Sequence, residues 1–302
     1  MTDVKRVRTL YDNTCSQILQ IRNEIVSQRE SALNSTAAFN EWVDQLEERN
    51  GEDWCRQRCL VRFPESFLFT VVMPVFNESQ TIAAMIERVC QVDLPMELIV
   101  VDDGSTDGTT DVLHQLENEN SESVSSFGTI QKKFLFHEVN QGKGAALKTG
   151  FKAASGNVIG IQDADQEYDP QEFVALLSTL LLDEADVVYG SRFAAGNKTN
   201  SPGWHRFGNG LITWFSNLMT GLNVTDAETC YKLMRKSFLD EIVDGLKEKR
   251  FGIELEMTAK LAKNKSIRFD ERPISYDKRT YAEGKKIGIR DGFRALWCIL
   301  KY

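Results

Sequence analysis

Ile-Val-Val-Asp-Asp-Gly-Ser, residues 99–105, is the stretch that decides the fold. A second stretch of the same kind, Val-Ile-Gly-Ile-Gln-Asp-Ala-Asp, covers residues 158–165. An apolar run that stops on two carboxylates is typical of a buried parallel strand whose carboxyl end carries a polar site. Because ligands of open α/β sheets gather at those ends, we expect the two acidic pairs to form one site. The pairs are Asp102 with Asp103 and Asp163 with Asp165.

The second pair indicates a metal. Asp163 and Asp165 stand on alternate positions, close enough to share one divalent cation through oxygen ligands. Carboxylates near such a cation commonly serve a diphosphate, because the metal offsets charge on the leaving group. Aspartate also starts turns and caps helices, and we interpret Asp107 in that way.

From Phe67 onward, strand-like and helix-like segments alternate. Short runs rich in β-branched and aromatic residues predict strands at 67–75, 97–103, 133–138, 157–162 and 186–189. Helices are predicted between them at 79–92, 107–116, 143–154 and 171–182. The polar residues 117–129 predict a loop. This alternation predicts an α/β fold with a mostly parallel sheet covered by helices on both faces.

Residues 1–66 differ in pattern. Apolar residues recur at helical spacing, and a second helical run over 36–50 precedes Gly51, a predicted C-cap. We therefore expect a helical extension, a hairpin or short coiled coil over 1–66, followed by one domain over 67–302. The extension is typical of a segment that packs against its domain or self-associates, and a homodimer through these helices is one expectation.

Bulk composition excludes some classes of protein. The 302-residue chain has a net charge of −8 and a pI near 5.2, which disfavours nucleic-acid binding. It has no apolar stretch of eighteen residues and no apolar core of a secretory signal near Met1, so we expect a cytoplasmic protein without a membrane-spanning helix. Two amphipathic segments, Trp204–Asn223 and Gly288–Tyr302, predict either core packing or peripheral contact with a membrane.

Seven blocks in a fixed order carry a family resemblance. They lie at 74–78 (PVFNE), 101–105 (VDDGS), 140–146 (NQGKGAA), 163–165 (DAD), 190–193 (GSRF), 226–232 (DAETCYK) and 279–286 (RTYAEGKK). In these blocks the chain resembles the family 2 inverting glycosyltransferases of the GT-A fold. Within that family it is most similar to the polyprenyl-phosphate hexosyltransferases, the dolichyl-phosphate mannose or glucose synthase branch. The resemblance covers Phe67 to the carboxyl terminus.

The resemblance implies a nucleotide-sugar donor, UDP- or GDP-linked, and a metal, Mg²⁺ or Mn²⁺. Residues implied to line the nucleoside pocket are Pro74, Phe76, Glu78 and Asp103, with Asp102 beside them in a structural role. Asp163, Ala164 and Asp165 match the DxD motif that holds the metal against the diphosphate. Glu167 stands where mannose synthases often carry glutamine, which weakens the assignment of mannose and of a guanine base. Lys143 is available to a phosphate, and Gly142 and Gly144 are expected to let a helix start close to the sheet.

The same resemblance implies a polyprenyl phosphate as acceptor. Arg279, Lys285 and Lys286 match the segment that closes over the diphosphate, and Glu283 is the one acid among the five bases between Lys278 and Arg290. Arg192 and Arg206 would grip the phosphate of the acceptor. A phosphate monoester has a second pKa of about 6, so it is an anion at neutral pH and needs no general base.

Two other functions stay open. A hydroxyl acceptor would need a carboxylate base, and the candidates are Asp226, Glu228, Glu254 and Glu256. Alternatively, the domain is a degenerate sugar-nucleotide binder and residues 1–66 act as an interaction module, although the intact acidic pair and basic arm count against this.

Overall fold

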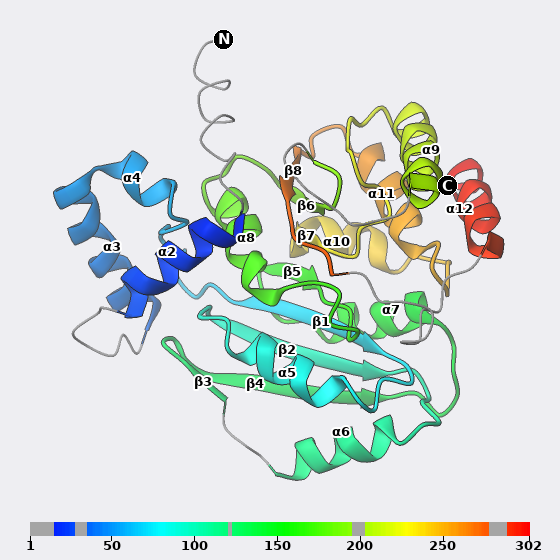
Figure 1. Ribbon diagram of the computed structural model, residues 1–302, viewed down its shortest axis with the longest axis horizontal. Helices are drawn as coiled ribbons and strands as arrows, with labels where there is room; N and C mark the ends of the chain where they lie inside the picture. Colours follow the sequence, from blue (N-terminus) through cyan, green and yellow to red (C-terminus); the bar gives the residue numbers. More distant parts are fainter. Residues whose placement is uncertain (1–14, 28–34, 120–122, 195–202, 278–288) are drawn as a thin grey trace.

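A mixed sheet forms the centre of the molecule (Figure 1). The computed structural model describes residues 15–27, 35–119, 123–194, 203–277 and 289–302. In these residues eight strands lie in the order β3-β4-β2-β1-β5-β7-β6-β8. Their bounds are β1 Phe69–Val75, β2 Met96–Asp102, β3 Ser123–Ser125, β4 Gly128–Phe136, β5 Val158–Ile161, β6 Val187–Ser191, β7 Lys232–Arg235 and β8 Phe269–Pro273. β4, β2, β1 and β5 run parallel, whereas β7 is antiparallel to both of its neighbours.

Helices connect and cover the strands. They are α5 Ile82–Cys90, α6 Thr109–Asn118, α7 Lys143–Ala153, the short 3₁₀ helix η1 Pro170–Glu172, α8 Phe173–Leu181, α9 Gly203–Thr220, α10 Lys236–Val243, α11 Ile253–Lys263 and α12 Ile289–Lys301. The predicted α/β architecture is confirmed, and the predicted strands and helices lie within a few residues of those observed, except at 117–129. Figure 1 shows α2, α3 and α4 on the left of the sheet and α9 and α12 on the right.

The central strands are buried on both faces, as their uninterrupted apolar runs predict. Every residue of β1 and of β2 is buried. Pro74 lies inside β1, opposite Val101, although proline removes a donor from the ladder. The strand tolerates it because the pairing of β1 with β5 ends at Val72, two residues earlier.

The predicted loop over 117–129 is wrong in part. α6 continues to Asn118, and Ser123–Ser125 pairs with 128–130 as an antiparallel hairpin at the edge of the sheet. The turn is made by Gly128, whose φ of 109° suits glycine, and by Ser126, whose N–H donates to Asp93. A polar edge hairpin of this kind lacks the apolar run on which the strand prediction depends.

The amino-terminal helices pack against the domain. They are α2 Cys15–Ser27, α3 Thr36–Asn50, which ends at Gly51 as predicted, and α4 Glu52–Arg56. Phe39 of α3 packs against Phe63 and Phe127, with ring centroids 5.3 and 5.2 Å away, and it is part of the main core. The packing alternative is therefore observed, while a homodimer and the division at residue 66 stay predictions.

Asp186 links the last strands and gives a pH prediction. Arg268 and Arg235 donate to its carboxylate, which lowers the pKa of Asp186 to about 2. Because the pKa is lowered in the folded state, the ionised carboxylate stabilises the fold at pH values above about 4, the ordinary pKa of aspartate. This stabilisation is lost as the pH falls through 2. We expect Asp186→Asn to lose about 1 kcal/mol at pH 6, a value reduced because Arg268 is half exposed. Urea unfolding at pH 6 and pH 2 measures this loss, which should shrink at pH 2; Asp240→Asn, in an exposed pair with Lys236, serves as control.

Candidate active site

The carboxyl ends of β2 and β5 flank the end of β1, so the topology brings both acidic pairs to one edge of the sheet. Val75 lies opposite Asp102, and the N–H of Asp103 donates to the carbonyl of Val75 at 2.8 Å. The amino terminus of α7 then connects the pairs. The N–H of Gly142 donates to Asp103, and the next residue, Lys143, binds Asp163.

Asp102 and Asp103 are both buried, with all their oxygens bound by the protein itself. Asp102 accepts from Ser105 and Thr110, in agreement with a structural role. Asp103 accepts from the backbone of Gln141 and Gly142, and its Oδ1 lies 2.7 Å from Nδ1 of His137. As the site stands, Asp103 orders the loop before α7, and a contact with the nucleoside base stays a prediction.

Lys143 bridges two carboxylates. Its Nζ lies 2.8 and 3.0 Å from the two oxygens of Asp163 and 2.9 Å from Oε1 of Glu254 on α11. Burial opposes the charge of Lys143, but Asp163 and Glu254 outweigh it and raise the pKa of the ammonium group. The other oxygen of Glu254, Oε2, is buried and has no hydrogen-bond partner among the described residues.

Gly142 and Gly144, on either side of Lys143, make close contacts with another segment than the sheet that was expected. A Cβ on Gly142 would lie 2.1 Å from the carbonyl oxygen of Lys249, and one on Gly144 would lie 2.2 Å from that of Glu248. Gly142 also has a φ of 101°. The two glycines therefore let the segment before α11, and not the sheet, pack closely against the start of α7. The residue that brings α7 close to the sheet is Gly150, whose Cβ would lie 2.3 Å from Val72.

Asp165 lies in a concentration of negative charge. Burial, then Asp163, then Glu167 raise the pKa of Asp165 to about 7. Glu167 is anchored by Tyr276, whose hydroxyl donates to it at 2.8 Å, and by the N–H of Asp277. Half-buried carboxylates that repel one another fit a divalent cation, which would relieve the repulsion.

The described side chains do not by themselves complete the coordination of a metal ion. No group of three or more His, Cys, Asp or Glu side chains within the described ranges is arranged to hold a metal. Asp163 and Asp165 therefore fit a cation whose remaining ligands are water or ligand oxygens, as at a Mg²⁺ site that also binds phosphates.

Arg192 directly follows β6, beyond the strands that carry the two acidic pairs. Its Nε and Nη2 bind the fully buried carboxylate of Asp226 at 2.6 and 2.8 Å, and its guanidinium stacks 5.2 Å from the ring of Tyr276. With its amide oriented for best hydrogen bonding, Asn209 of α9 joins Arg192 to Glu228. Burial raises the pKa of Glu228 to about 7, partly opposed by Arg192.

The other predicted residues divide into three groups. Pro74, Phe76, Glu78 and Ala164 lie at the carboxyl ends of β1 and β5, as expected. Arg206 lies on α9, but its side chain is not described. Arg279, Lys285 and Lys286 lie outside the described residues, so their roles stay predictions.

Two candidate bases have structural positions. Glu256 is fully buried and accepts the N–H groups of Lys247 and Glu248, so its carboxylate holds the turn before α11. Asp226 is likewise occupied by Arg192. Two candidate bases remain: Glu254, whose Oε1 binds Lys143, and Glu228, which lies beside Arg192.

The glycosyl transferase family 2 model matches residues 70–243, more than half of the chain and every element from β1 to α10. The chain belongs to this family. Membership makes the protein a glycosyltransferase.

Relatives of this glycosyltransferase are distant. A UDP-N-acetylglucosamine–dolichyl-phosphate N-acetylglucosaminyltransferase of Methanococcus voltae is 25% identical over 240 residues, 77% of this chain and 95% of the relative. An undecaprenyl-phosphate mannosyltransferase of Micrococcus luteus is 28% identical over 226 residues, 72% and 86% of the two chains. A glucosyl-3-phosphoglycerate synthase of Mycobacterium tuberculosis, solved with Mn²⁺ and UDP, superposes with a TM-score of 0.54 at 19% identity, covering 78% of this chain and 79% of that one. The expected GT-A fold is confirmed.

Three residues that orient predicted site residues could not be predicted from the sequence. Tyr276, His137 and Asn209 each orient a predicted residue: Glu167, Asp103 and Arg192, respectively. None of the three lies in one of the seven blocks, and no local sequence pattern points to them.

Lys143 gives a prediction for metal binding. Because its ammonium group occupies both oxygens of Asp163, it competes with a cation there. We expect Lys143→Met to bind Mn²⁺ about tenfold more tightly in the absence of nucleotide, since one positive charge is removed from the site. Calorimetric titration with Mn²⁺ measures this. Lys148→Met on the same helix, where the lysine binds the carbonyls of Asp244 and Leu246, should leave the affinity unchanged.

Proposed function

We propose that the protein transfers a hexose, with inversion, from a nucleotide-diphosphate sugar to the phosphate of a polyprenyl lipid. The observation that carries the proposal is the pair of opposed charges at one edge of the sheet. Asp163 and Asp165 stand on one side and Arg192 on the other, joined through Glu167 and Tyr276. This arrangement suits a reaction with a metal-bound leaving group and an anionic nucleophile.

In this proposal the nucleotide-sugar donor binds beside Asp163 and Asp165. Mg²⁺ or Mn²⁺ held by Asp163 and Asp165 would offset the charge of the leaving diphosphate. Lys143, which binds Asp163 here, would on release bind a phosphate oxygen of the donor. Oε2 of Glu254, which has no partner in the described part of the chain, is an acceptor suited to a sugar hydroxyl. The donor assay described below identifies the nucleotide of the donor, UDP or GDP.

Acceptor binding follows from Arg192. Asp226 takes Nε and Nη2 of the guanidinium, and Nη1 makes no hydrogen bond to a described residue. A phosphate can accept from that nitrogen while Asp226 holds the group in place. Because the phosphate monoester is already an anion at pH 7, catalysis then requires positioning and charge stabilisation but no proton transfer.

Membrane contact is part of the proposal. No helix within the described ranges is long and apolar enough to cross a bilayer. Both relatives named above are named for lipid-linked acceptors. We propose that the protein lies peripherally on the cytoplasmic face of a membrane through α9 and α12.

A second candidate function rests on Glu228. Its pKa of about 7 is that of a general base at neutral pH, and it lies beside Arg192. A hydroxyl acceptor would use this carboxylate as the base.

A donor panel tests the proposal. Purified protein with Mn²⁺ or Mg²⁺ and a polyprenyl phosphate in mild detergent is incubated with UDP- and GDP-linked hexoses, and lipid products are identified by mass spectrometry. We expect one hexosyl-phosphoryl lipid whose formation stops when the metal is chelated. Donor hydrolysis with no lipid product would contradict the proposal and favour a hydroxyl acceptor.

A further inference from the structure

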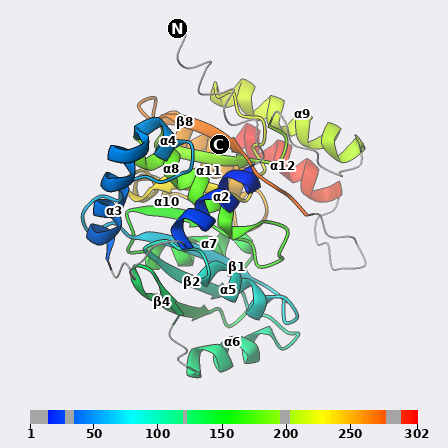
Figure 2. The same ribbon diagram turned by 60° about the vertical axis from the view of Figure 1, so that its left-hand side comes forward.

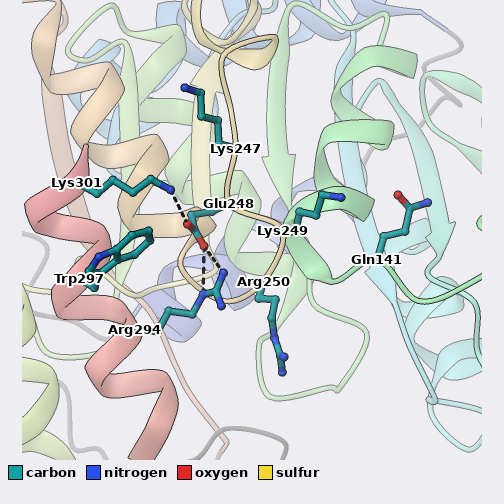
Figure 3. Close-up of a pocket in the computed structure, with 8 residues that line it drawn as sticks. All are labelled: Gln141, Lys247, Glu248, Lys249, Arg250, Arg294, Trp297 and Lys301. Atoms are coloured by element: carbon teal, nitrogen blue, oxygen red, sulfur yellow. Dashed lines mark hydrogen bonds and ion pairs between the residues drawn. The ribbon is translucent and has the colours of Figure 1, made fainter.

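A basic pocket lies between the segment before α11 and the helix α12 (Figure 3). Its volume is about 690 Å³, within the range of ligand-binding cavities. Five bases line it against a single acid, Glu248; the bases are Lys247, Lys249, Arg250, Arg294 and Lys301. In a chain with a net charge of −8, such a concentration of positive charge indicates an anionic ligand.

Glu248 neutralises only the bases on α12. It is buried, and it accepts from Arg294 at 2.9 Å and from Lys301 at 3.5 Å, which fixes α12 to the segment before α11. Figure 3 shows the ends of Lys249 and Arg250 turned away from Glu248. Neither side chain, nor that of Lys247, makes a hydrogen bond or ion pair with a described residue, so these three charges are uncompensated within the described part of the chain.

One wall of the pocket continues into an exposed apolar surface. Trp297 lines the pocket and is 51% exposed, and Leu300, on the next turn of α12, is 65% exposed. α9 packs beside α12, as both ribbon views show (Figure 2). Seven of the nine large apolar side chains that are exposed among the described residues lie on these two helices; those on α9 are Phe207, Leu211, Trp214, Leu218 and Met219. An exposed apolar patch of this kind needs a partner.

We propose that the pocket binds the phosphate headgroup of an anionic membrane lipid while α9 and α12 lie on the bilayer. Basic side chains next to exposed tryptophan and leucine are the combination that recognises an anionic lipid surface. A soluble nucleotide would satisfy the charges but would leave the apolar side chains in water. The inference rests on the membrane contact of the proposed function, yet it needs neither donor nor acceptor to be tested.

Vesicle flotation tests it with full-length protein. The vesicles contain phosphatidylcholine alone or phosphatidylcholine with 30% phosphatidylglycerol, and no polyprenyl phosphate. We expect binding to the anionic vesicles that weakens at 0.5 M salt, because screening reduces surface electrostatics. Each basic side chain near an anionic surface contributes about fivefold in affinity, so Arg250→Glu should bind at least about tenfold more weakly. Arg49→Glu, an exposed arginine of α3 at the other end of the molecule, should bind as wild type does.

A second readout separates this inference from the proposed function. Transfer to a short-chain polyprenyl phosphate in detergent should be unchanged in Arg250→Glu, because no bilayer is needed there. If the wild-type protein does not bind to the anionic vesicles, the inference is overturned, whatever the transfer activity of the protein. An Arg250→Glu variant that floats normally but binds the nucleotide sugar more weakly by calorimetry would also overturn it, because the pocket would then belong to the donor.

Discussion

Asp165→Asn should lower kcat/KM for hexosyl transfer by about 1,000-fold or more without loss of stability. The variant loses one of two carboxylates available to the cation, and metal stabilisation of a leaving group contributes several kcal/mol, each 1.4 kcal/mol being a factor of ten in rate. Burial and two neighbouring carboxylates hold the pKa of Asp165 near 7, so its charge costs folding energy. A neutral amide of the same shape removes that cost. Transfer kinetics, Mn²⁺ titration and thermal unfolding measure the three effects.

Asp169→Asn is the matched control for this prediction. Asp169 lies four residues further along and caps η1, outside the charge cluster. It should retain wild-type kcat/KM and Mn²⁺ affinity. If Asp165→Asn kept more than a tenth of the activity, the DxD assignment in this chain would be wrong.

Arg192→Met should cost about 3–5 kcal/mol of unfolding free energy and abolish transfer. Asp226 is completely buried, and removing the guanidinium of Arg192 takes away the ion pair that balances its charge. The double variant Arg192→Met/Asp226→Leu replaces the ion pair by apolar side chains, which is often close to neutral for stability. We therefore expect the double variant to recover most of the stability, measured by urea unfolding, but none of the transfer.

The double variant decides what Arg192 does. Recovered stability without activity means that the guanidinium is needed at the reaction, as a ligand of the acceptor phosphate. Recovery of both would show that Arg192 only supports the fold. Arg235, which pairs with Asp186 away from the site, gives the comparison: Arg235→Met should lose stability but keep its kcat/KM.

The central strands and the acidic pairs could be predicted from the sequence because each depends on a contiguous pattern. An apolar run that ends on aspartates specifies both a buried strand and the position of its polar end. Asp163 and Asp165 therefore lie at the predicted edge of the sheet.

The partners of these residues could not be predicted, because they come from distant segments. Tyr276 meets Glu167 across 109 positions of sequence, through the pairing of β8 with β6. Glu254 reaches Lys143 from α11. The same limitation explains the assignment of Gly142 and Gly144 to the sheet, since their close neighbour is the 248–249 backbone. Local patterns carry no information on which loop crosses above a helix terminus.

The choice between a phosphate and a hydroxyl acceptor is the most direct test of the proposed reaction. A single preparation would be offered a polyprenyl phosphate and the matching polyprenol, and the wild type would be compared with Glu228→Gln. We predict product from the phosphate alone, at a rate that Glu228→Gln leaves within about threefold, because an anionic nucleophile needs no base. Product from the polyprenol, or loss of all activity in Glu228→Gln with the fold intact, would contradict the account.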